Sequence, residues 1–203
     1  MSKKGTNGGS LALSAYRWAL GLDQPPTWGA SWHRPRDVDA AALVETEKTT
    51  PPELLDAIQH LLMIPRSTAI RVVYRCPSAG AMPAMELMRR LVDLKDLFPG
   101  SNVARMVELL PSAFLGTEDW EGVVGHVRRT SEMLRSGLHG ADLDAMFERD
   151  PTILFESVAS MEVGLRRLRE LWSVDAAALK NSDPEELALA VRALGLNGPP
   201  KTV

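Results

Sequence analysis

Paired arginines recur along this chain, and no other side chains in it have a type and spacing so well suited to a chemical task. A guanidinium group keeps its charge at neutral pH and donates a fork of hydrogen bonds that fits a phosphate. Pairs that return at intervals predict a row of phosphate contacts along one surface. The candidate nucleic-acid-binding residues are Arg89, Arg90, Arg128, Arg129, Arg166, Arg167 and Arg169.

A second interpretation of these arginines is structural. Each pair has an acidic residue three or four positions away, and at that spacing two side chains are neighbours on a helix and form an ion pair. The pairs in question are Glu86–Arg90, Arg129–Glu132 and Glu162–Arg166. A further basic stripe, formed by Arg66, Arg71 and Arg75, has the same two interpretations.

The charge of the chain is unevenly distributed. Residues 1–36 contain five basic side chains and one acidic one, whereas residues 37–203 contain 18 basic and 25 acidic side chains, a net charge of −7. Proteins that bind nucleic acid without regard to sequence normally have a basic footprint. The acidic balance therefore favours an alternative in which the chain is a structural scaffold subunit of a large complex.

Other chemistry finds little support. The single Cys76 excludes an internal disulfide or a multi-cysteine metal site, and the four histidines have no metal-ligand spacing. The chain has no nucleotide-binding glycine motif and no GxSxG sequence. No apolar run reaches the roughly 18 residues that span a bilayer. We expect a protein that is not an enzyme and that uses no metal, cofactor, small-molecule substrate or membrane.

The elements that must position the arginines repeat along the chain. Residues 98–115 align with residues 138–155 at an offset of 40 without a gap, and apolar positions stay apolar. Four residues recur identically: Gly100, Met106, Glu108 and Pro111 at Gly140, Met146, Glu148 and Pro151. Fainter copies lie on either side, so that four successive units are marked by Pro77, Pro111, Pro151 and Pro184.

Each unit is predicted to consist of helices. Apolar residues at helical spacing predict long helices, for example Leu87, Leu91, Leu94 and Phe98. A short helix follows, capped by Asn102 or Asp142 and preceded by Gly100 as a C′ glycine, and it ends near the next proline. Because one apolar stripe cannot be buried alone, neighbouring units must stack. We expect an all-α, curved α-solenoid of about four repeats, with residues 37–60 capping one end.

At this register the chain resembles the mitochondrial transcription termination factor (mTERF) family, whose repeats are triplets of helices. The resemblance lies in residues 94–115, in Arg149-Asp150-Pro151-Thr152-Ile153-Leu154-Phe155, and more broadly in residues 54–196. It implies a curved superhelix whose basic concave face tracks the phosphate backbone of double-stranded DNA or structured RNA. It also implies a role in organelle gene expression, in transcription, splicing or ribosome assembly. For the scaffold alternative, it implies protein and RNA partners within a ribonucleoprotein such as the organellar ribosome.

Residues 1–36 form a basic leader ahead of the helical-repeat domain at 37–203. The stretch Leu11-Ala12-Leu13-Ser14-Ala15-Tyr16-Arg17-Trp18-Ala19-Leu20 is amphipathic, and the leader is poor in acids. This pattern is typical of an organelle transit peptide and predicts a location in the mitochondrion or chloroplast. Trp18, Trp28 and Trp32 support the alternative of an arm that docks on a partner.

Overall fold

The computed structural model describes residues 39–172 and 182–196, and the leader at 1–36 lies outside these ranges. Helices are the only regular secondary structure among the described residues, so the expectation of an all-α chain is confirmed. The elements are α3 (Ala40–Thr49), α4 (Pro52–Leu62), α5 (Arg66–Arg75), η1 (Pro77–Ala81), α6 (Ala84–Leu97), α7 (Val103–Leu109), α8 (Pro111–Leu115), α9 (Trp120–Gly137), α10 (Leu143–Arg149), η2 (Pro151–Phe155), α11 (Val158–Trp172) and α13 (Pro184–Leu196).

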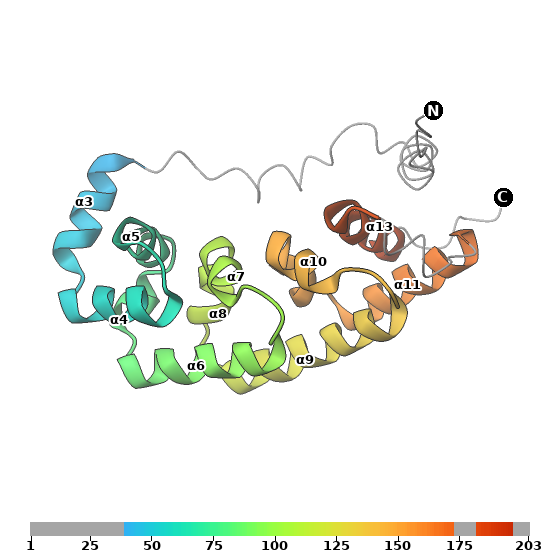
Figure 1. Cartoon of the computed structure of the whole chain (residues 1–203), viewed down its shortest axis with the longest axis horizontal. Coiled ribbons are helices and arrows are strands. Elements are labelled where there is room, and N and C mark those ends of the chain that lie inside the picture. The colour runs from blue at the N-terminus through green and yellow to red at the C-terminus, as the bar shows by residue number, and fades with distance from the viewer. Residues whose placement is uncertain (1–38, 173–181, 197–203) are drawn as a thin grey trace, which may run out of the picture.

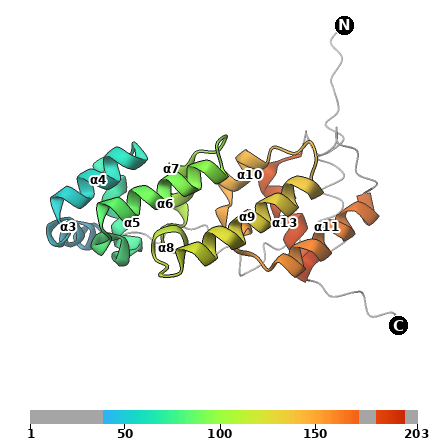
Figure 2. The ribbon, with the colours of Figure 1, turned by 90° about the horizontal axis from the view of Figure 1, so that it is seen from below.

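The helices form an elongated row of two layers. The long helices α6, α9 and α11 follow one another along the lower side of Figure 1, and α5, α7, α10 and α13 lie above them. Figure 2 shows the same succession of long helices from below. The row is bowed, and the layer of long helices lies on its outer side (Figure 1).

The apolar stripes predicted for the long helices are buried between the layers. On α6, Leu87, Leu91, Leu94 and Phe98 are buried, and on α11 the residues Met161, Leu165 and Leu168 are buried. On α9 the stripe includes two polar side chains, Thr130 and Ser131, which are also buried. Burial therefore follows the same helical positions in three successive long helices.

Backbone geometry also repeats from unit to unit. The residue before each marking proline has nearly one conformation: φ −138° and ψ 81° at Cys76, −134° and 57° at Leu110, and −137° and 74° at Asp150. Proline follows as the first residue of a short helical segment in all three cases. Proline restricts its predecessor to extended conformations and fits the first turn of a helix, so these breaks are fixed locally by sequence.

The predicted helix caps are confirmed. Asn102 Oδ1 accepts a hydrogen bond of 3.1 Å from the Arg105 amide, and Asp142 Oδ1 accepts one of 3.0 Å from the Ala145 amide. Asp183 Oδ1 accepts from the amide of Glu185 at the start of α13. Each cap satisfies an amide that has no partner within its helix.

The expectation for Gly100 as a C′ glycine was wrong. Helix α6 has its C-cap at Phe98, which places Gly100 one residue beyond C′, and among the described glycines only Gly140 has a positive φ, of 96°. Gly100 instead lies close to the next unit: a Cβ there would lie 2.2 Å from Asp144 Oδ2, so the Asp144 side chain would have to move. The recurring glycine thus allows a close approach between units at residue 100 and a left-handed turn at residue 140.

The two ends of the row differ from its middle. Residues 37–60, which were expected to cap one end, contain α3 and most of α4, and α4 holds the place of the long helix in the unit marked by Pro77. At the other end Pro184 begins α13, which is 13 residues long, whereas the segments that begin at Pro77, Pro111 and Pro151 have five residues each.

Candidate nucleic-acid interface

The structure assigns Arg90 to the core rather than to the surface. Its side chain is 7% exposed, and its guanidinium group lies over the ring of the buried Trp120, 5.1 Å from the centroid. Arg90 Nε donates to Glu86 Oε1 at 2.8 Å, and Nη1 donates to the carbonyl oxygen of Leu115 at 3.2 Å. With its donors turned to protein partners in the interior, Arg90 holds α6 against the segment that leads into α9.

Arg89 is exposed but surrounded by acids. It donates two hydrogen bonds to Glu86, at 2.9 and 3.0 Å, and a third to Glu121 on α9, at 2.7 Å. Hydrogen bonds from Arg89 and Arg90 lower the pKa of Glu86 to about 2, and the hydrogen bonds to Glu86 and Glu121 raise the pKa of Arg89. The structural interpretation of the arginine pairs therefore holds on α6.

On α9 and α11 the arginines lie on solvated helix faces, and the ion pairs expected from their spacing do not form among the described residues. Arg128, Arg129, Arg166 and Arg169 are all exposed. Among the described residues, no ion pair joins Arg129 to Glu132 or Arg166 to Glu162, although the spacing would allow both. These four arginines have no acidic partner within the described parts of the chain. Since α9 and α11 lie side by side, as Figures 1 and 2 show, the four unpaired cations belong to neighbouring helices. These helices are part of the outer layer of the bowed row, whereas the resemblance implies phosphate contacts on the concave face.

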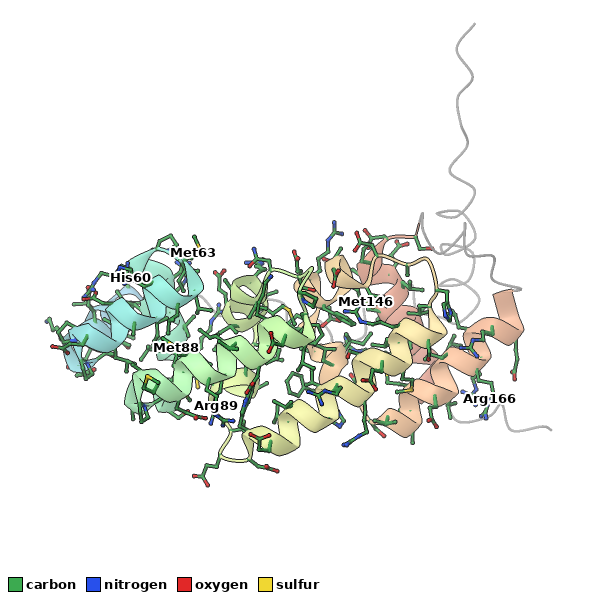
Figure 3. The ribbon with its side chains drawn as sticks, turned by 60° about the horizontal axis from the view of Figure 1, so that its bottom comes forward. His60, Met63, Met88, Arg89, Met146 and Arg166 are labelled. Carbon is green, nitrogen blue, oxygen red and sulfur yellow. The ribbon has the colours of Figure 1, made fainter. Side chains whose placement is uncertain are left out.

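Arg167 has a structural partner. Its Nη1 donates to the carbonyl oxygen of Leu194 at 2.7 Å, which links α11 to the last turn of α13. Arg89 and Arg166 lie at different points along the row of long helices in Figure 3, and the structure brings them to no common site. Four of the seven candidate arginines are therefore unpaired cations on two adjacent helices. The other three, Arg89, Arg90 and Arg167, bond to other parts of the protein.

The second basic stripe is also engaged. Arg66 donates to Glu47 at 2.8 Å and to Asp56 at 2.9 Å. Arg71 and Arg75 both reach Glu108 of the following unit, the first at its carboxylate and the second at its carbonyl oxygen. This stripe joins helices to one another.

A recurring glutamate is a unit-to-unit contact that sequence reasoning missed. Glu108 accepts from Arg71 of the unit before it, and its counterpart Glu148 accepts a hydrogen bond of 2.7 Å from the backbone amide of Asn102, also in the preceding unit. The signal was visible, because this glutamate was one of four residues identical in the two copies. A charged residue that recurs at a fixed register marks a contact that the repeat geometry itself creates.

A buried ionic cluster was missed as well. Arg192 of α13 and Asp150 are each about 7% exposed at the side chain, and they form an ion pair whose guanidinium group also donates to Thr152. Arg192 Nε lies 2.9 Å from Glu156 Oε1. The cluster ties α13 to the junction of α10 and η2. No local pattern predicts this cluster, since Arg192 and Asp150 are 42 residues apart in the sequence.

The described part of the chain has no cluster of side chains suited to holding a metal ion. Cys76 is buried, with its Sγ 3.2 Å from Ser78 Oγ. Among the residues at 39–172 and 182–196, no group of three or more histidine, cysteine or acidic side chains is arranged to hold a metal ion. Within the same ranges, no helix combines the length and the apolar character needed to cross a membrane.

Comparisons with known proteins add no relative. No family model, no curated protein and no solved structure matches this chain.

Proposed function

We propose that the chain is a curved α-solenoid of mTERF-like helical repeats, and that it binds nucleic acid in organelle gene expression. The regular return of backbone angles, proline starts and buried positions from one unit to the next supports this architecture. The buried apolar residues of successive units belong to one continuous core, as expected where units stack in a solenoid.

The observation that carries the binding proposal is the set of four exposed, unpaired arginines on α9 and α11: Arg128, Arg129, Arg166 and Arg169. In a folded part with excess acid, most arginines are neutralised by carboxylates or bonded to backbone carbonyls. Cations left free on adjacent helices are available to phosphates of double-stranded DNA or structured RNA. Location in the mitochondrion or chloroplast is part of the proposal and depends on the basic leader.

The test is the salt dependence of binding to a short DNA duplex or RNA hairpin. Each phosphate contact contributes about 0.9 to the slope of log affinity against log salt for duplex DNA. Replacing Arg128, Arg129, Arg166 and Arg169 with Gln should therefore flatten that slope by about 3 to 4 units.

A matched control removes the same number of charges from paired arginines. Four exposed arginines with acidic partners serve this purpose: Arg66, Arg89, Arg105 and Arg149, each replaced by Gln. Exposed ion pairs contribute little to stability, so this variant should fold. Its salt slope should stay within one unit of the unmodified protein. Equal flattening in both variants, or no binding by the unmodified protein, would refute the proposed interface.

The second candidate function is a scaffold subunit of an organellar ribonucleoprotein such as the ribosome. The net charge of −7 on residues 37–203 favours it, because a free nucleic-acid-binding domain rarely carries an acidic excess. In this case the purified protein should bind neither duplex DNA nor RNA hairpins at physiological salt, and it should sediment with ribosomal particles from the organelle.

A further inference from the structure

Helix α6 exposes apolar side chains on its solvent face. Met85 is 74% exposed, Val92 52% and Met88 43%. Their spacing of three and then four residues places them on one side of the helix, away from the buried stripe at Leu87 and Leu91. We call these three residues the α6 apolar face. Figure 3 shows Met88 on this helix, and Met63 at the end of the neighbouring α4.

The repeats provide an internal comparison for this face. The buried residues Leu87, Val127 and Met161 hold one position in the three long helices. One residue further on, Met88 corresponds to Arg128 and Glu162. Val92, four residues after Met88, corresponds to Glu132 of α9 and Arg166 of α11. Where α9 and α11 carry charges, as solvent-facing positions do, α6 carries apolar side chains.

The chemistry of the face fits a short helix with aromatic residues. Methionine side chains adapt to irregular surfaces, and their thioethers make favourable contacts with aromatic rings. Met63, which is 91% exposed, adds a further thioether at the C-cap of α4, the helix that packs on α6. Asp96, four residues after Val92, is exposed and has no ion pair within the described ranges, so a cation can pair with it.

We propose that the α6 apolar face is the docking site for the chain's own leader segment Leu11–Leu20. In a helix this segment would place Leu11, Ala15 and Trp18 on one side, at spacings of four and three residues. Its charge suits the partner, since the segment has Arg17 and no acid while residues 37–203 have a net charge of −7. Trp18 supplies the aromatic ring for the methionines, and Arg17 supplies a cation for Asp96.

The length of the intervening chain permits this contact. From Asp39, α3 and α4 extend about 15 and 16 Å at 1.5 Å per residue, so Met63 lies within about 45 Å even with an extended turn between them. Helix α6 packs on α4, which adds about 10 Å. Residues 21–38 span up to about 60 Å when extended. This proposal is independent of nucleic-acid binding, and it requires that the leader remain on the mature protein.

Cross-linking in the full-length protein tests the contact. Ala15→Cys is combined with Met88→Cys, and the control combines Ala15→Cys with Arg128→Cys, the corresponding position one unit later. The native Cys76 is buried and stays in place, and Ala15→Cys alone reports any reaction with it. With a short bismaleimide, the first pair should form an intramolecular cross-link at least ten times faster than the control pair.

A second assay does not depend on cysteine. Trypsin cleaves after Arg17, and docking should protect that bond. Met88→Arg with Val92→Glu gives α6 the residues that α9 has at these positions, so the variant should keep its fold, which circular dichroism verifies. Cleavage after Arg17 should become at least tenfold faster in this variant, while Arg128→Met with Glu132→Val should leave the cleavage rate unchanged.

Several results would overturn the proposal. Equal cross-linking rates for the two cysteine pairs would mean that the leader has no preference for α6. Cross-links between two chains would assign the face to a second copy of the protein. A mature protein that begins after residue 20 would have lost the segment altogether, and the face would then belong to another partner.

Discussion

One substitution is expected to have opposite effects at two glycines of the long helices. Gly125 lies within α9, and a Cβ there would have Arg129 Nη1 as its nearest neighbour, at 3.6 Å, an ordinary contact with a mobile side chain. Gly164 lies within α11, and a Cβ there would lie 2.2 Å from the carbonyl oxygen of Val191 on α13. Gly125→Ala should therefore stabilise the protein and Gly164→Ala should destabilise it.

The magnitudes follow from two opposing contributions. Alanine is favoured over glycine within a helix by about 0.5 to 1 kcal/mol, and this gain applies at both positions. At Gly164 the obstacle is main chain, which cannot rotate away, and the Cβ requires α11 and α13 to move apart. Overpacking of this kind costs about 1 to 3 kcal/mol and exceeds the gain. The close approach is mutual, because a Cβ at Gly195 would lie 2.3 Å from the carbonyl oxygen of Ser160.

Thermal unfolding followed by circular dichroism measures both effects. For a chain of about this length, 1 kcal/mol corresponds to a shift of roughly 2 to 4 °C in Tm. Gly125→Ala should raise Tm by about 1 to 4 °C, and Gly164→Ala should lower it by several degrees. Hydrogen exchange should show the loss of protection concentrated in α13. If Gly164→Ala matched the unmodified protein in Tm and in α13 protection, the close packing of α11 on α13 would be refuted.

Two further predictions concern charged clusters. Asp150→Leu introduces the residue that the preceding unit has at Leu110, and it should lower the free energy of unfolding by about 3 to 5 kcal/mol because it removes the buried partner of Arg192. Adding Arg192→Met should recover at least about 1 kcal/mol, measured by urea titration. A double variant less stable than the single one would contradict this reasoning. Hydrogen bonds from Arg89 and Arg90 lower the pKa of Glu86 to about 2, so the stability that its carboxylate contributes is present above about pH 4.5 and is lost as the pH falls toward 2. The Tm of Glu86→Gln should accordingly lie below that of the unmodified protein at pH 6. This difference in Tm should narrow as the pH is lowered from 5 to 2. A difference that stays constant would mean that the Glu86 carboxylate is not the group responsible.

The pattern of helices was largely accessible from sequence because its causes are local. A proline constrains its own and the preceding residue, a capping aspartate bonds to an amide two or three residues away, and an apolar stripe needs only the helical period. For these reasons the breaks at Pro77, Pro111 and Pro151 and the caps at Asn102 and Asp142 were placed correctly.

Which arginines are paired or buried could not be predicted from such local patterns. Arg89 and Arg128 both belong to an arginine pair within a long helix, yet Arg89 meets Glu121 of the next helix and Arg128 meets no acid among the described residues. Arg90 is buried where Trp120, 30 positions later, packs against its guanidinium group and Leu115, 25 positions later, accepts its hydrogen bond. Such outcomes depend on which residues of one unit face the next.

By itself, then, the amino-acid sequence determined where helices begin and end, which face of each is buried, and that the units recur along the chain. The tertiary structure alone decided which cations are neutralised, why Gly164 must lack a side chain, and that Arg192 pairs with Asp150. The physical reason is the sequence separation over which each interaction acts. Helix signals act over four residues or fewer, whereas the hydrogen bonds by which Arg90 and Glu148 join neighbouring units link positions 25 and 46 residues apart, and stacking sets their partners.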